Sequence, residues 1–93
     1  MKNKKEMRIM QNHYIDAMVK KMPALRATTK MTQAVLAEKI GVGRQSIVSI
    51  ETGKRPMTWS LYLAVCCIFE QYEDSKKLLE IYELFDAEFV KAI

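Results

Sequence analysis

A group of polar side chains able to form hydrogen bonds lies in the segment TQAVLAEKIGVGRQSIVSIETGKR, residues 32–55. One expected helix includes Arg44, Gln45, Ser46 and Ser49, which all carry such groups. Ile47 and Ile50 of the same helix already provide a buried face, so the helical period places the polar groups on the exposed side. They are either ordinary solvated positions or groups that bind a ligand.

Two short helices, separated by Gly-Val-Gly at residues 41–43, are expected to position these side chains. Thr32 is suited to cap a first helix over residues 33–40, and Gly41 to end it in a left-handed conformation. The second helix is expected over about residues 44–52. The positions suited to a steep crossing of the two helices are Leu36, Ala37, Ile40, Gly41, Val42, Ile47 and Ile50.

Helices are also expected before this pair. Apolar residues recur at steps of three and four from Met10 to Met22, which indicates an amphipathic helix. Pro23 then predicts either a new helix that begins near Met22 or a long helix that bends there. Residues 2–8 are charged, and we expect a mobile arm or a frayed helix start.

The C-terminal part is expected to contain two or three further helices. Thr58 or Ser60 can cap a helix through Leu61–Phe69, whose residues are apolar almost all round and therefore central to the core. Asp74 or Ser75 can cap the next helix, and Asp86 can start a last helical turn.

Composition limits the chain to one small domain with short extensions. It has 93 residues, of which 49% are hydrophobic and 28% charged, with only 3 Gly and 2 Pro, so an all-α fold is expected. The charge is uneven: residues 1–30 carry eight Lys and Arg against two acids, whereas residues 57–93 carry three against seven. This asymmetry suits a polyanion-binding front and an acidic back.

No targeting or membrane segment is expected, because the longest apolar run, Leu61–Phe69, is less than half of the ~20 residues that span a bilayer. Cys66 and Cys67 are neighbours in the chain and fit neither a disulfide framework nor a metal site. We expect a reducing cytoplasm, no metal and no cofactor. Catalysis is not expected either, since His13 is the single histidine and the GVG segment is too short to hold a phosphate.

From Leu25 to Arg55 the sequence LRATTKMTQAVLAEKIGVGRQSIVSIETGKR resembles the helix-turn-helix domains of the Cro and phage-repressor type, the XRE family of bacterial transcriptional regulators. The resemblance implies a lambda-repressor-like bundle of five to six helices, here with an N-terminal extension. We therefore divide the chain into an extension at 1–21, a DNA-binding domain at 22–72, and C-terminal helices at 73–93 for core closure or dimerisation.

The resemblance also assigns roles to individual residues. The helix from about Arg44 to Thr52 would lie in the major groove of double-stranded DNA. The expected base-reading residues are Arg44, Gln45, Ser46, Val48 and Ser49, and the expected phosphate-binding residues are Thr32, Gln33, Lys54 and Arg55. Arg26 and Glu51 occupy the positions of a partly buried structural ion pair.

Two departures from the family pattern stand out. Gly43 is found where a Ser or Thr more often caps the recognition helix, so the start of that helix is either looser or closer to the DNA. Pro23 and the segment before it are the second departure.

Two partners besides operator DNA are considered. A homodimer on two half-sites is expected, with Lys76–Ile93 as the favoured interface and the N-terminal helix as second choice. The alternative function is that of an antitoxin or adaptor, whose main partner is another protein. The expected location is the bacterial cytoplasm, in association with the nucleoid.

Overall fold

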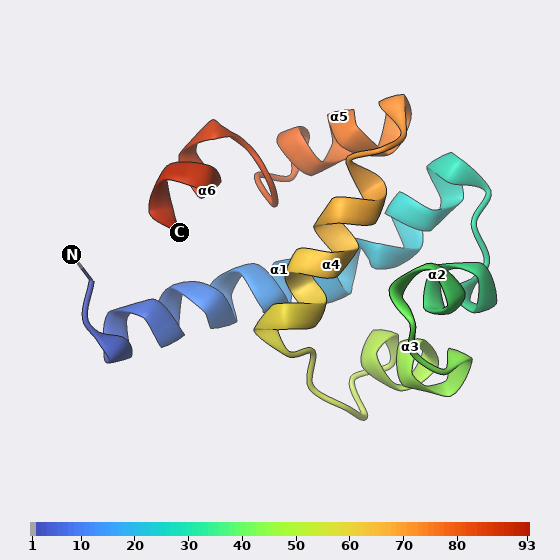
Figure 1. Ribbon diagram of the computed structural model, residues 1–93, viewed down its shortest axis with the longest axis horizontal. Coiled ribbons are helices and arrows are strands. Elements are labelled where there is room, and N and C mark those ends of the chain that lie inside the picture. Colours follow the sequence, from blue (N-terminus) through green and yellow to red (C-terminus); the bar gives the residue numbers. More distant parts are fainter. Residues whose placement is uncertain (1) are drawn as a thin grey trace.

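The structure is a computed structural model that describes residues 2–93. Those residues contain six α-helices and no strand (Figure 1). The helices are α1 (Lys4–Thr29), α2 (Gln33–Ile40), α3 (Arg44–Glu51), α4 (Trp59–Phe69), α5 (Glu73–Ile81) and α6 (Ala87–Ala92). The prediction of a small all-α bundle with five to six helices is confirmed.

Helix α1 is continuous for 26 residues, and Pro23 lies inside it. A new helix beginning near Met22, one of the two alternatives at this proline, is therefore wrong. Proline in a helix interior leaves one backbone carbonyl without its N–H partner. Met22 and Leu25, on either side of the proline, are fully buried, so packing against the core holds both parts of the helix in place.

The N-terminal charged residues form the first turns of α1 from Lys4 onward rather than an arm. The Asn3 side chain accepts a hydrogen bond from the Glu6 backbone N–H at 2.8 Å, and its amide donates to the Glu6 carboxylate at 3.1 Å. This reciprocal cap fixes the first turn. The proposed extension at 1–21 starts at Met1, outside the described residues, and α1 passes through its end at residue 21 without interruption.

Helix α4 lies at the centre of the core, as its apolar sequence predicts. In Figure 1 it crosses α1 near the middle of the molecule, with α5 and α6 above it and α2 and α3 at the lower right. The buried apolar residues form one cluster: Met18, Met22, Leu25, Met31, Leu36, Ala37, Ile47, Ile50, Met57, Tyr62, Val65, Cys66, Phe69, Leu79, Leu84 and Phe89. The Thr58 side chain caps α4 by accepting from the Leu61 N–H, so Thr58 rather than Ser60 fills this role.

The C-terminal helices close the core. Leu79, Leu84 and Phe89 are fully buried, and the Tyr62 hydroxyl of α4 donates to the Leu84 carbonyl. The prediction that Asp74 or Ser75 caps α5 is wrong, because α5 begins at Glu73. Ser75 is instead buried within the helix, and its hydroxyl donates to the Phe69 carbonyl at 2.7 Å.

The start of α6 follows the sequence expectation. The Asp86 side chain accepts a hydrogen bond from the Phe89 backbone N–H at 2.8 Å. Phe89 then packs edge-on against Tyr14 of α1, with the ring centroids 4.7 Å apart. This contact attaches the last helix to the first.

Candidate nucleic-acid interface

Helices α2 and α3 pack against each other about a tight turn. The Thr32 hydroxyl caps α2 by accepting from the Val35 N–H at 3.1 Å, and Gly41 ends it with a positive φ of 91°. A positive φ strains any residue that has a Cβ atom, whereas glycine adopts it without this cost in free energy. The turn brings α3 close to Ala37, which is 2% exposed and lies in the core cluster beside Ile47.

Helix α3 has one buried face and one accessible face. Ile47 and Ile50 are buried, whereas Arg44 and Gln45 are exposed at the start of the helix. The remaining candidate base-reading residues, Ser46, Val48 and Ser49, are partly buried. The Gln45 side-chain amide donates to the Ser49 hydroxyl at 3.4 Å, one turn further along, so these two candidates share a surface. The accessible face therefore carries donors, acceptors and the apolar Val48 side by side.

The start of α3 has no side-chain cap. Gly43 is its N-cap residue, with φ −73° and ψ 150°, an ordinary extended conformation. A Cβ atom built at Gly43 would meet nothing within 4 Å. Neither the backbone angles nor the packing require glycine here.

The loop after α3 returns along the same helix. Gly53 adopts φ 80°, and the backbone N–H groups of Lys54 and Arg55 both donate to the Ser49 carbonyl, at 2.8 and 3.2 Å. Lys54 and Arg55 are exposed. Two positive charges are thereby held close to the end of the candidate recognition helix.

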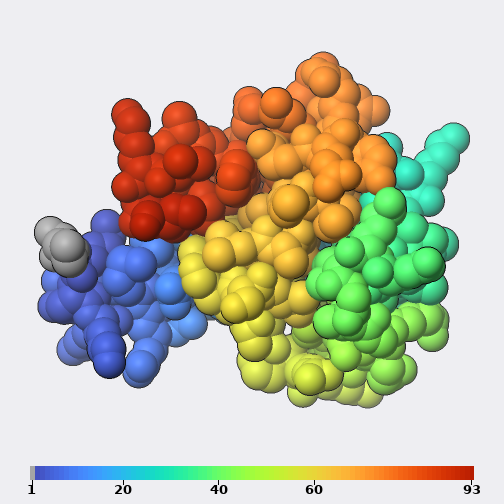
Figure 2. Space-filling model, viewed as in Figure 1, coloured from blue at the N-terminus to red at the C-terminus, as the bar shows by residue number. Residues whose placement is uncertain are grey.

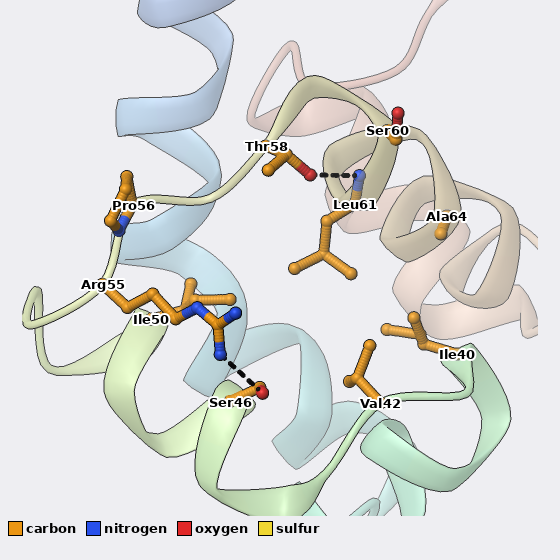
Figure 3. Close-up of a pocket in the computed structure, with 10 residues that line it drawn as sticks. All are labelled: Ile40, Val42, Ser46, Ile50, Arg55, Pro56, Thr58, Ser60, Leu61 and Ala64. Atoms are coloured by element: carbon orange, nitrogen blue, oxygen red, sulfur yellow. Dashed lines mark hydrogen bonds between the residues drawn. The ribbon is translucent and has the colours of Figure 1, made fainter.

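Arg55 turns back toward the beginning of α3. Its Nη1 donates to the Ser46 hydroxyl at 2.9 Å across the mouth of a cavity of about 350 Å³ (Figure 3). The cavity is lined mainly by apolar side chains from the turn between α2 and α3 and from α4, among them Val42 and Leu61. The sequence assigned Ser46 to bases and Arg55 to phosphates, whereas the structure brings the two side chains together.

Arg26 and Glu51 form a two-pronged ion pair between α1 and the end of α3. Arg26 Nε and Nη2 donate to the two carboxylate oxygens of Glu51, each at 2.8 Å. The Glu51 side chain is 5% exposed and the Arg26 side chain 18%. Arg26 Nη1 also donates to the Met31 carbonyl at 3.3 Å, a partner that no sequence pattern indicates because it is a backbone atom.

Gln33 joins the same network from the first turn of α2. Its side-chain amide donates to Glu51 Oε1 at 3.2 Å. A glutamine amide has two N–H groups, so one remains to donate to an anion in front of α2. The exposed Thr32 lies beside it and is first of all the helix cap. A single carboxylate, that of Glu51, thus orients the first helix, the start of α2 and the end of α3.

The two cysteines lie on α4, outside the α2–turn–α3 segment. Burial raises the pKa of the Cys66 thiol to about 12, and burial also raises the pKa of the neighbouring Tyr62 hydroxyl. A thiol with so high a pKa stays protonated at neutral pH and is a poor nucleophile. Cys66 is therefore a core residue, in keeping with its place in the apolar helix.

The arrangement of α2, turn and α3, with an accessible polar face on the second helix, defines a helix-turn-helix, a DNA-binding motif. Residues 22–88 match the helix-turn-helix domain family, and the chain belongs to that family. No curated protein and no solved structure matches the chain. No helix within residues 2–93 is long and apolar enough to cross a membrane.

Proposed function

We propose that this protein is a sequence-specific transcriptional regulator of the Cro and phage-repressor type, a repressor that binds operator DNA as a dimer. The observation that carries the proposal is the accessible face of α3, flanked by positive groups on the loop that follows it. The family match at residues 22–88 supports DNA as the partner. The resemblance of the segment from Leu25 to Arg55 to Cro and phage-repressor domains supports the assignment to that type of regulator.

In the proposed complex, α3 enters the major groove with Arg44 and Gln45 foremost. An arginine can donate to both acceptors on a guanine edge, and a glutamine can pair with adenine in the same two-pronged way. Val48 offers an apolar contact to a thymine methyl group, and Ser49 a hydroxyl. Each good bidentate pair supplies about 1–3 kcal/mol of discrimination between bases.

The phosphate contacts come from both ends of the motif. Gln33 and Thr32 lie at the N-terminus of α2, where unpaired N–H groups favour an anion. Lys54 and Arg55 lie on the loop after α3. On binding, a phosphate can replace the Ser46 hydroxyl as the acceptor for Arg55, which frees Ser46 to face the DNA. Phosphate contacts of this kind fix the register of α3, and base contacts specify the sequence.

Dimerisation through residues 76–93 is supported by apolar side chains left outside the core. Ile81, Val90 and Ile93 are 70%, 52% and 53% exposed. The same three residues are also what favours the alternative of an antitoxin or adaptor that binds a protein. The two functions differ in the main partner. A transcriptional regulator binds DNA through the face that includes α3, whereas the main partner of an antitoxin or adaptor is another protein.

The test is selection of bound sequences from a pool of random duplex DNA. A palindromic enriched site is expected, with half-sites one helical turn apart. Affinity for the enriched duplex should fall steeply as salt rises, because phosphate contacts release counterions. Absence of enrichment and of binding to any genomic fragment at about 50 mM salt, together with firm binding to a co-purified protein, would favour the antitoxin or adaptor function instead.

A further inference from the structure

About the first two-thirds of α1, residues 4–21, lies outside the part of the chain that matches the family. The match begins at residue 22, whereas α1 begins at Lys4. Tyr14, Ile15 and Ala17 pack against the core cluster, whereas no residue from 2 to 13 is buried or belongs to that cluster. The core therefore does not account for the first turns of α1. Extending a packed helix adds one hydrogen bond per residue without a new nucleation cost, so the first turns can remain helical in water.

One face of α1 is turned toward the candidate DNA-binding loop that follows α3. A cavity of about 500 Å³ separates α1 from the loop after α3 and is lined on the helix side by Asn12, Ile15, Asp16, Val19 and Lys20. The loop side of the cavity includes Gly53, Arg55 and Pro56. In Figure 2 the N-terminal part of α1 (blue) and this loop (yellow-green) lie on either side of an indentation.

The same helix face becomes basic toward the N-terminus. A second cavity is lined by Lys4, Lys5, Arg8, Ile9 and Asn12. Asn12 lines both cavities, and residues four or so apart lie on one side of a helix. The three basic residues therefore continue the side of α1 that faces Arg55.

The N-terminal end of this face of α1 carries a strong positive charge. Lys4, Lys5 and Arg8 are exposed. The nearby Glu6 carboxylate accepts from the Asn3 amide in the helix cap. Asp16, further along the face, is followed four residues later by Lys20, the spacing at which opposite charges on a helix attract each other. The positive excess thus lies in the first two turns.

The distances suit a second contact with the same duplex. With a rise of about 1.5 Å per residue, Lys4 and Arg8 lie roughly 12–18 Å along the axis from the middle of the segment that faces the loop. Phosphates of one DNA strand follow one another at about 3.4 Å along the duplex axis. In a complex in which α1 runs alongside the duplex, this span covers several base pairs, so the basic face reaches phosphates beyond those near Lys54 and Arg55.

We propose that Lys4, Lys5 and Arg8 bind backbone phosphates of the DNA that flanks each half-site, so that the extended α1 lengthens the footprint without reading sequence. The inference rests on the proposed function, because it requires α3 to be bound to duplex DNA. Its ligand is the phosphate backbone, recognised by charge alone.

The test uses the full chain and two duplexes, the enriched site with about one additional helical turn on each side and the same site trimmed to its half-sites. The variant is K4Q/K5Q/R8Q. The matched control is K21Q/K30Q/K39Q, which removes three exposed charges outside both the DNA-facing residues and the proposed dimer interface and gives the same net charge. Glutamine is a good helix former, and circular dichroism checks that helix content is unchanged.

The α1 variant should bind the long duplex at least about tenfold more weakly than the native chain at low salt, with a salt slope smaller by roughly 0.9 for each lost contact. On the trimmed duplex the two proteins should bind equally. The control should match the native chain on both duplexes. Hydroxyl-radical footprinting of the native complex should show protected flanking phosphates, and this readout remains decisive if the variant loses helix content.

Other outcomes separate the two proposals. Native protein that binds no duplex overturns the proposed function and this inference with it. Native protein that binds both duplexes equally, with no flanking protection, overturns the inference alone. A variant that changes oligomeric state and binds both duplexes more weakly by the same factor would make this face a protein interface, which also overturns it.

Discussion

Glu51 is the acid whose role is least evident from its neighbours in the chain, since it follows Ile50 on a helix with an exposed polar face. In the structure its two oxygens accept from Arg26 and from Gln33. The ion pair follows from the family resemblance, and the sequence alone identifies both residues. The Gln33 bond is a different matter, because it depends on the crossing angle of α2 and α3, which no local pattern determines.

Replacing Arg26 with Ala should destabilise the fold far more than replacing Arg44 with Ala. Arg26→Ala leaves the Glu51 carboxylate buried without its partner, which costs about 3 kcal/mol, or a fall in Tm of more than about 10 °C for a domain of this size. Arg44 is exposed and has no partner among the described residues. Thermal unfolding followed by circular dichroism measures both changes. Equal melting temperatures would contradict the assignment, and E51Q serves as the second variant of the pair.

Substitution of Arg44 and substitution of Lys54 should affect DNA binding in different ways. Arg44→Ala removes a proposed base contact, so it should cost about 1–3 kcal/mol on the enriched site and relax the preference at one position of each half-site. Lys54→Ala removes a proposed phosphate contact, so it should weaken binding to all sequences alike and lower the salt slope by about 1. Repeating the selection and the salt titration with each variant tests this. Identical effects of the two substitutions would argue against the division of roles.

At the scale of single elements, α2 and α3 could be predicted because their limits are set by local chemistry. Thr32 supplies a cap acceptor, and Gly41 and Gly53 supply the positive φ values that end or follow each helix. The course of α1 through Pro23 could not be decided from sequence, because burial of Met22 and Leu25 outweighs the local preference of proline. The start of α5 was misplaced for a similar reason: Ser75 looks like a cap but is needed inside, as a donor to Phe69.

The two glycines of the turn should respond oppositely to serine. Gly43→Ser places a side-chain acceptor at the N-cap of α3 in open space, which should raise the unfolding free energy by roughly 0.5 kcal/mol. Gly41→Ser forces a side-chain-bearing residue to φ 91° and should lower it by about 1 kcal/mol. Denaturant unfolding measures both. A destabilising Gly43→Ser would mean that the start of α3 needs glycine for a reason other than backbone angle or space.

At the scale of the whole molecule, the sequence predicts which residues gather at the candidate interface but not how they pair. The basic loop and the polar face of α3 are evident from spacing alone. The hydrogen bond between Arg55 and Ser46 joins residues nine positions apart and depends on the path of a loop. The sequence likewise predicts that the C-terminal helices carry apolar residues. It does not predict which of those residues are buried in the core and which stay exposed.

The proposed dimer can be tested at the exposed apolar residues. V90K/I93K should convert a dimer to a monomer without loss of helix content, since both side chains are more than half exposed and neither belongs to the core. Ile9→Lys, at a residue that is 61% exposed on α1, is the matched control and also tests the second-choice interface. Sedimentation equilibrium gives the oligomeric state. If only Ile9→Lys dissociates the dimer, the interface belongs to the N-terminal helix.

The unbroken course of α1 gives the molecule a property that a flexible arm would lack. Each residue of an α-helix advances the chain by about 1.5 Å and turns it by about 100°, so a single insertion between Met10 and Asn12 would swing Lys4, Lys5 and Arg8 away from the side that faces the loop. An insertion of seven residues would return them close to their original direction but about 10 Å further out. In the proposed complex, the number of helical residues between Arg8 and Pro23 would therefore set two things. It would set the distance from the operator centre to the flanking phosphate contacts, and it would set the side of α1 on which the basic residues lie.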